Sequence, residues 1–121
     1  MIRGIRGAIT VVEDSNEQVL KETARLLQEL IHSNDIDPDA VASVIISTTT
    51  DITSAFPARA VRGLEGWNYV PVMCTHEMNV PGALEKCIRL LVHVNTDKSQ
   101  QAIQHIYLNN AVQLRPDLIQ K

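Results

Sequence analysis

Apolar and polar side chains alternate most regularly in residues 86–95, KCIRLLVHVN. In strand geometry the apolar side chains at even positions, from Ile88 to Val94, share one face, and the side chains between them share the other. The pattern predicts a buried β-strand with a permanent cation, Arg89, near its middle. Because a buried arginine usually has a carboxylate partner, an ion pair across the sheet is the simplest expectation from the pattern alone.

Three further segments have the composition of strands. Residues 2–12, IRGIRGAITVV, contain two glycines that allow another group to approach the backbone. Residues 42–50, ASVIISTTT, are rich in β-branched side chains, which favour strands. Residues 69–74, YVPVMC, are a shorter candidate, in which Pro71 indicates an edge strand or a bulge.

One long amphipathic helix is predicted from about residue 13 to Ser33. Apolar side chains recur along it at intervals of three and four residues, opposite a charged face. Asp14 or Ser15 can cap its first turn, with Glu17 or Gln18 three residues further on.

The remaining segments are less regular. Residues 37–41 predict a helical turn, and residues 51–67 predict a loop and a short helix that begins at Pro57. Residues 75–84 read as an irregular loop. Residues 102–114 fit a strand or a helix equally well, and the tail 115–121 reads as frayed.

The resulting order, β-α-β-α-β-β-β, predicts one α+β domain over residues 1–121, with a mixed sheet and one long helix. A single long helix cannot cover both faces of five strands, so much aliphatic sheet surface would stay exposed in a monomer. We therefore expect an oligomer.

Composition narrows the functional classes. Of the 121 residues, 45% are hydrophobic, which is enough for a core, and the net charge of −3 argues against a nucleic-acid surface. The chain has two cysteines and neither a signal peptide nor an apolar run long enough to span a membrane. These features predict a cytoplasmic protein with free thiols and no membrane partner.

A second arginine on a predicted strand suggests a binding site for an anion. Arg6 lies on the first predicted strand, and its neighbours on the same face, Gly4 and Ala8, leave space around it. Together with Arg89 it favours an anion pocket. Arg59 and Arg62 could add positive charge, although a solvated helix face explains either of them alone.

Other polar residues give weaker indications. Glu77 can be a surface acid or an acceptor for a ligand hydroxyl, and the Tyr107 hydroxyl can bind an anion or simply reach water. A cysteine–histidine set could in principle gather around zinc, but its spacing fits no standard finger, so no metal is expected. Cys74 lacks an evident His–Asn pair that would make it a nucleophile. The members of the cysteine–histidine set are Cys74, His76, Cys87 and His93.

Several short motifs, in this order and spacing, resemble those of the AroH-type chorismate mutases. They are IRGIRGAIT, TDITSAFPARAVR, GWNYVPVMC followed by EM and PG, CIRLLVHVNTD, HIYL and LRPDL, and they extend from Ile2 to about Leu118. The resemblance implies a trimeric pseudo-α/β-barrel that converts chorismate to prephenate without a cofactor. It also implies three active sites in clefts between neighbouring subunits.

The resemblance assigns roles to individual residues. Arg6 and Tyr107 would bind a substrate carboxylate, Arg89 would lie at the ether oxygen, and Glu77 with Cys74 would hold the ring hydroxyl. The adjacent subunit would close the cleft, and a C-terminal segment would fold over it. The closing residues are Phe56, Ala58, Arg59 and Arg62, the wall residues are Val72 and Met73, and the C-terminal residues are Leu114 and Arg115.

Two positions depart from the family pattern. Relatives can carry lysine at Arg59, so only its charge transfers, and they can carry a hydroxyl residue at Met73, so only a backbone contact is expected there. On this interpretation Arg89 can be buried without needing a permanent carboxylate partner, because the dianionic substrate completes its pairing. The alternative is a trimeric module that binds small carboxylates or hydrolyses imines.

Overall fold

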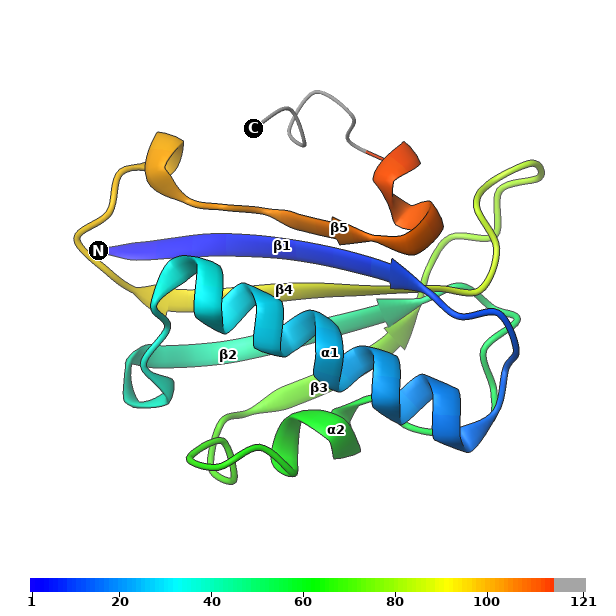
Figure 1. Ribbon diagram of the computed structural model, residues 1–121, viewed down its shortest axis with the longest axis horizontal. Helices are drawn as coiled ribbons and strands as arrows, with labels where there is room; N and C mark the ends of the chain where they lie inside the picture. The colour runs from blue at the N-terminus through cyan, green and yellow to red at the C-terminus, as the bar shows by residue number, and fades with distance from the viewer. Residues whose placement is uncertain (115–121) are drawn as a thin grey trace.

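The computed structural model describes residues 1–114 and contains a five-stranded mixed sheet in the order β3-β2-β4-β1-β5 (Figure 1). The α+β prediction is confirmed, and the predicted strand at 86–95 is the central one. The strands are β1 (Ile2–Thr10), β2 (Val41–Thr48), β3 (Val72–His76), β4 (Cys87–Asn95) and β5 (Ile106–Leu108).

The central strand β4 has the predicted two-faced pattern. It pairs antiparallel with β1 on one side and with β2 on the other. The side chains from Ile88 to Val94 at even positions are at most 4% exposed, whereas Arg89, Leu91 and His93 are half-buried.

Helix α1 (Asn16–Asn34) lies along one face of the sheet (Figure 1). Ser15 is its N-cap and accepts a hydrogen bond from the Gln18 backbone N–H. Gln18 in turn accepts from the backbone N–H groups of Val12 and Glu13, which fixes the entry of the chain into the helix. The helix and the even positions of β4 share one core.

Helix α2 (Ala58–Arg62) is short and lies beside α1. Its buried residues Ala58 and Val61 pack into the core that α1 forms with the sheet. Pro57 precedes its first turn and Gly63 ends it, as expected. Short 3₁₀ helices occupy residues 38–40, 100–102 and 109–113.

Most of the opposite face of the sheet is open, since neither α1 nor α2 covers it and, among residues 1–114, the 3₁₀ helix at 109–113 packs only against its end near Ala8 and Cys87. It carries the odd positions of β4 and the residues beside them in β1 and β2. Ile45, on β2, is 40% exposed although β2 is an internal strand. This face is the aliphatic surface that the sequence predicted to require a partner.

Three predicted boundaries were wrong. The edge strand β3 covers Val72–His76 rather than 69–74, and β1 ends at Thr10. Residues 102–114 are neither one strand nor one helix, since β5 lies between two 3₁₀ turns. The tail from Arg115 onward lies outside the described residues. Within the part that is described, no helix is both long and apolar enough to cross a membrane.

Candidate active site

Arg89 and Tyr107 lie on the open face in one row that crosses the whole sheet. Ala8 pairs with Arg89 on one side and with Tyr107 on the other, and Ser47 pairs with Arg89 and with Thr75. The small side chains of Ala8 and Ser47 leave a hollow of about 200 Å³ between the larger ones. Arg6 and Leu114 also line this hollow, which we call the arginine hollow.

Glu77 forms an ion pair with Arg89. The Arg89 Nη1 atom lies 3.1 Å from Glu77 Oε2, and the two side chains are 35% and 30% exposed. The Glu77 backbone N–H donates to Thr48 O at 2.7 Å, which continues the β3 ladder and holds the carboxylate near β4. Arg89 therefore has a carboxylate partner within its own chain, although the resemblance did not require one. The ion pair that the strand pattern alone suggested is present.

Two polar atoms at the arginine hollow are nevertheless buried without a partner among the described residues. They are Arg89 Nε and the Tyr107 hydroxyl. A buried polar group without a hydrogen bond costs roughly 1–3 kcal/mol, and such groups often mark a place where a ligand binds. Both atoms belong to the row through Ala8, so one anionic ligand could meet both.

Cys87 lies close to this row but does not add reactivity. It packs with Ala8, Tyr107 and Ala111 and is 1% exposed. Burial raises the pKa of the Cys87 thiol, against a smaller opposing effect of the Arg89 charge. The thiol is therefore neutral at physiological pH and is a poor nucleophile.

Cys74 does not face the arginine hollow with its side chain. It pairs with Ile46, whose side chain is fully buried beneath the helices, and it packs against the same core. Cys74 and His76 thus lie on the helix side of the sheet, whereas Cys87 and His93 lie on the open side. These four residues do not converge on one point, and the described residues contain no group of three metal-ligating side chains.

The edge position of β3 decides which of its backbone groups are available. Val44 N–H donates to Pro71 O, and Glu77 N–H donates to Thr48 O. The alternation of a parallel ladder then directs the Met73 backbone groups toward β2 and those of Cys74 toward the free edge. Met73 presents only its side chain to the open face, where it is 71% exposed. The backbone contact expected at Met73 is therefore not available. Val72 packs against the core.

The expected cleft-closing residues form a second group, away from the arginine hollow. Phe56 and Arg59 line a separate hollow of about 500 Å³ together with Cys74 and Thr53. Phe56 is 72% exposed, and Arg59 and Arg62 are also exposed, whereas Ala58 is buried in the core of its own chain. The two hollows share no lining residue. A single copy of the chain therefore does not bring the two groups together.

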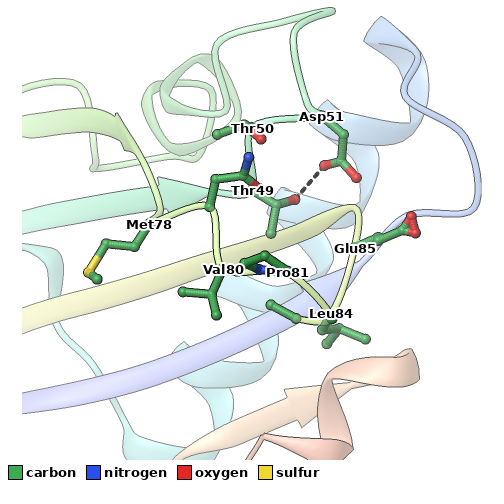
Figure 2. A pocket seen from close by; sticks show the side chains of 11 residues that line it. Thr49, Thr50, Asp51, Met78, Val80, Pro81, Leu84 and Glu85 are labelled. Carbon is green, nitrogen blue, oxygen red and sulfur yellow. Dashed lines mark hydrogen bonds between the residues drawn. The ribbon is translucent and has the colours of Figure 1, made fainter.

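A third hollow, of about 580 Å³, has the wrong charge for an anion. It lies between residues 49–51 and the loop 78–85, and Asp51 and Glu85 are at its margin (Figure 2). The Asp51 carboxylate accepts from the Thr49 hydroxyl and from the Lys86 backbone N–H. These bonds fix the chain where β4 begins, so this hollow has a structural explanation.

Three lining residues of the arginine hollow were not singled out from the sequence. Ile45, Ser47 and Leu91 lie on the open face beside Arg6 and Arg89. All three lie in segments that were predicted as strands. The pairing that places Ser47 opposite Arg89 is a long-range contact, and the pattern within each segment does not reveal it.

Fold and site together define a small α+β protein whose open sheet face carries a cationic pocket with buried hydrogen-bond donors that are unpaired among the described residues. Comparison with known proteins gives the family. Residues 2–118 match the family model described as chorismate mutase type I, and the chain belongs to this family.

Individual relatives agree over nearly the whole chain. The chain is 51% identical to chorismate mutase AroH of Bacillus subtilis, over 98% of its own length and 93% of the relative's. It is 47% identical to chorismate mutase AroH of Thermus thermophilus, over 98% and 97% of the two lengths. A solved chorismate mutase from Clostridium thermocellum superposes with a TM-score of 0.87 at 45% identity, covering 90% of this chain and 96% of that one.

Proposed function

We propose that the protein converts chorismate to prephenate, in the biosynthesis of phenylalanine and tyrosine, at sites shared between neighbouring copies of the chain. The observation that carries this proposal is the arginine hollow, where Arg89 Nε and the Tyr107 hydroxyl are buried and have no partner within residues 1–114. A dianionic substrate supplies acceptors for both donors. Membership of the chorismate mutase family identifies which dianion to test.

The chemical step is an intramolecular Claisen rearrangement. The C–O bond breaks before the new C–C bond is complete, so negative charge grows on the ether oxygen. A guanidinium fixed beside that oxygen stabilises the transition state more than the ground state. We assign this role to Arg89, whose Nη1 is already oriented by Glu77 at 3.1 Å and whose Nε is free to donate.

Binding selects the reactive shape of the substrate. In water the enolpyruvyl side chain is mostly extended, and holding both carboxylates in the folded form is a proximity contribution. Arg6 and Tyr107 are placed to hold one carboxylate from β1 and β5. Glu77 accepts a hydrogen bond from the ring hydroxyl. Cys74 contacts the substrate with its backbone groups, which lie at the free edge of β3, rather than with its thiol.

The shared site explains why two groups of candidate residues lie apart in one chain. In a homotrimer the α2 segment of one copy would meet the open sheet face of the next. Phe56, Arg59 and Arg62 would then close the arginine hollow and add positive charge. Ala58, buried in its own core, would support that segment rather than touch substrate, and Leu114, which lines the hollow, would help to cover the opening.

The direct test is the loss of chorismate's ultraviolet absorbance with purified protein, without any added cofactor and with EDTA present. We expect saturable turnover, because the proposed step needs neither a metal nor a proton carrier. Chorismate binding without turnover would instead support the alternative of a carboxylate-binding module.

The two cysteines are free thiols, which suits a cytoplasmic enzyme.

A further inference from the structure

Asp14 lies in the turn between β1 and α1, and its side chain accepts hydrogen bonds from residues about 40 positions further along the chain. Its carboxylate accepts from the backbone N–H of Thr53 at 3.0 Å and from the Thr53 hydroxyl at 3.2 Å. It also accepts from the backbone N–H of Ser54 at 3.2 Å and from the Ser54 hydroxyl at 2.7 Å. Both carboxylate oxygens thus hold one dipeptide of a different segment.

Helix capping does not explain this arrangement. Ser15 caps α1, and Gln18 binds the backbone of Val12 and Glu13, so the helix start is complete without the Asp14 side chain. The Ser54 hydroxyl, together with the other three donors, lowers the pKa of Asp14 below its usual 3.8 despite partial burial. The carboxylate is therefore ionised at neutral pH, when its hydrogen bonds are charge-assisted and strong.

The held dipeptide leads directly into the exposed segment that carries Phe56, Arg59 and Arg62. Before the dipeptide, Ile52 is anchored by its burial and by His76 Nε2, which lies 3.2 Å from Ile52 O. After it, the partly buried Ala55 packs against the core, and Pro57 and Ala58 are buried. Asp14 therefore fixes the stretch between two anchors, at the margin of the hollow that Phe56 and Arg59 line.

We propose that Asp14 is a positioning residue that orients the Phe56–Arg62 segment toward the active site of the neighbouring copy. The inference rests on the proposed shared-site chorismate mutase activity and deepens it. Asp14 touches no substrate itself. It acts through the backbone of Thr53 and Ser54 on side chains that bind substrate in another chain.

Kinetics of single variants give the first test. Asp14→Asn keeps the size of the side chain but replaces one carboxylate oxygen with an NH2 group, whose N–H donors then face the donors of either Thr53 or Ser54. We expect KM for chorismate to rise on the order of tenfold, with kcat changed much less, since substrate binding rather than the Arg89 contact is disturbed. Ser54→Ala, which removes one of the four bonds from the other side, should shift KM in the same direction by less.

Glu13→Gln is the matched control. It removes a negative charge from the adjacent residue, whose exposed side chain makes no hydrogen bond or ion pair with the described residues, and it leaves the backbone hydrogen bonds of that residue intact. KM should stay at the wild-type value. An equal rise in KM for Glu13→Gln would indicate a general charge effect and would overturn the role of Asp14.

Hybrid assemblies test the transfer between chains. Asp14→Asn and Arg89→Ala chains, each with a different affinity tag, are co-expressed, and assemblies that carry both tags are isolated. In some sites of these hybrids an intact face from the Asp14→Asn chain meets an intact segment from the Arg89→Ala chain. Every trimer that carries both tags has one such site among its three, so kcat/KM should exceed the mean of the two parents roughly sixfold.

The outcomes separate the two proposals. If wild type does not turn over chorismate, the proposed function fails, and if Arg89→Ala is fully active, the catalytic role assigned to Arg89 fails. If wild type is active and Arg89→Ala is not, but Asp14→Asn has a normal KM, only the positioning role is refuted. An impaired Asp14→Asn chain whose hybrids show no gain, or that forms no hybrids, would place its effect within its own subunit and would also refute the inference.

Discussion

At the scale of single residues, Arg89 uses different atoms for different purposes. Nη1 is held by Glu77, whereas Nε is buried and available. An ion pair whose side chains are about one-third exposed adds little to stability, so its main effect is to fix the direction of the guanidinium. The sequence placed Arg89 on a central strand but did not reveal Glu77 as its partner, because residues 75–84 carry no periodic pattern.

The different positions of Cys74 and Glu77 lead to opposite expectations for their substitution. Cys74→Ala should keep substantial activity, with a loss below about 1 kcal/mol, because the thiol faces the core and not the arginine hollow. Glu77→Ala should lose about 1.5–3 kcal/mol or more of transition-state stabilisation, because it removes a charged acceptor that also orients Arg89. Steady-state kcat/KM measures both. If the alanine variant at Cys74 were inactive and that at Glu77 normal, covalent catalysis would have to be reconsidered.

Asp14 gives a prediction for acid stability. Its pKa is lowered in the folded protein, so its ionised form contributes stability that is fully present above 3.8 and is lost as the pH falls through the lowered value. Asp14→Asn should therefore be less stable than wild type at pH 6, and this difference should vanish at pH values below the lowered pKa. Urea unfolding across this range measures it. A difference that stays constant down to the acid limit would mean that the charge of Asp14 is not responsible.

At the scale of elements, local pattern predicted some parts well and others poorly. Strand β4 and helix α1 have long, regular periodicities, and both were correctly placed. Strands β3 and β5 were not, because each is short and ends where pairing with β2 or β1 ends. The Asp14 side chain is a similar case: the sequence offered it as a helix cap, but donors about 40 residues away bind it instead.

The contact between β1 and α1 gives an element-scale prediction. A Cβ atom at Gly7 would lie 2.9 Å from Leu30 Cδ1 and 3.1 Å from Leu26 Cδ1, and both leucines are fully buried. Gly7→Ala should therefore destabilise the protein by about 1–3 kcal/mol through overpacking. Gly4→Ala, in the same strand, meets only Leu91 Cδ1 at 3.4 Å and should be close to neutral. Urea unfolding of both variants at one protein concentration makes the comparison, and equal stabilities would contradict the close helix–strand contact.

At the scale of the whole molecule, the open sheet face and the separation of the two residue groups have one explanation. Both are resolved when a second copy places its α2 segment on the open face. We predict a trimer in sedimentation equilibrium at micromolar concentration. A monomer with full activity would contradict both the assembly and the shared cleft.

The central claim is that the positive charge of Arg89 stabilises the transition state, and kcat of Arg89 variants tests it most directly. Arg89→Ala should lose at least ~3 kcal/mol, a decrease of more than about a hundredfold, which is the scale of a lost oxyanion donor. Arg89→Lys should recover only part of the rate, because an ammonium group does not reproduce the guanidinium fork. Arg89→Met, a neutral side chain of comparable length, should be as slow as Arg89→Ala. A near-normal kcat for Arg89→Met would contradict the electrostatic account.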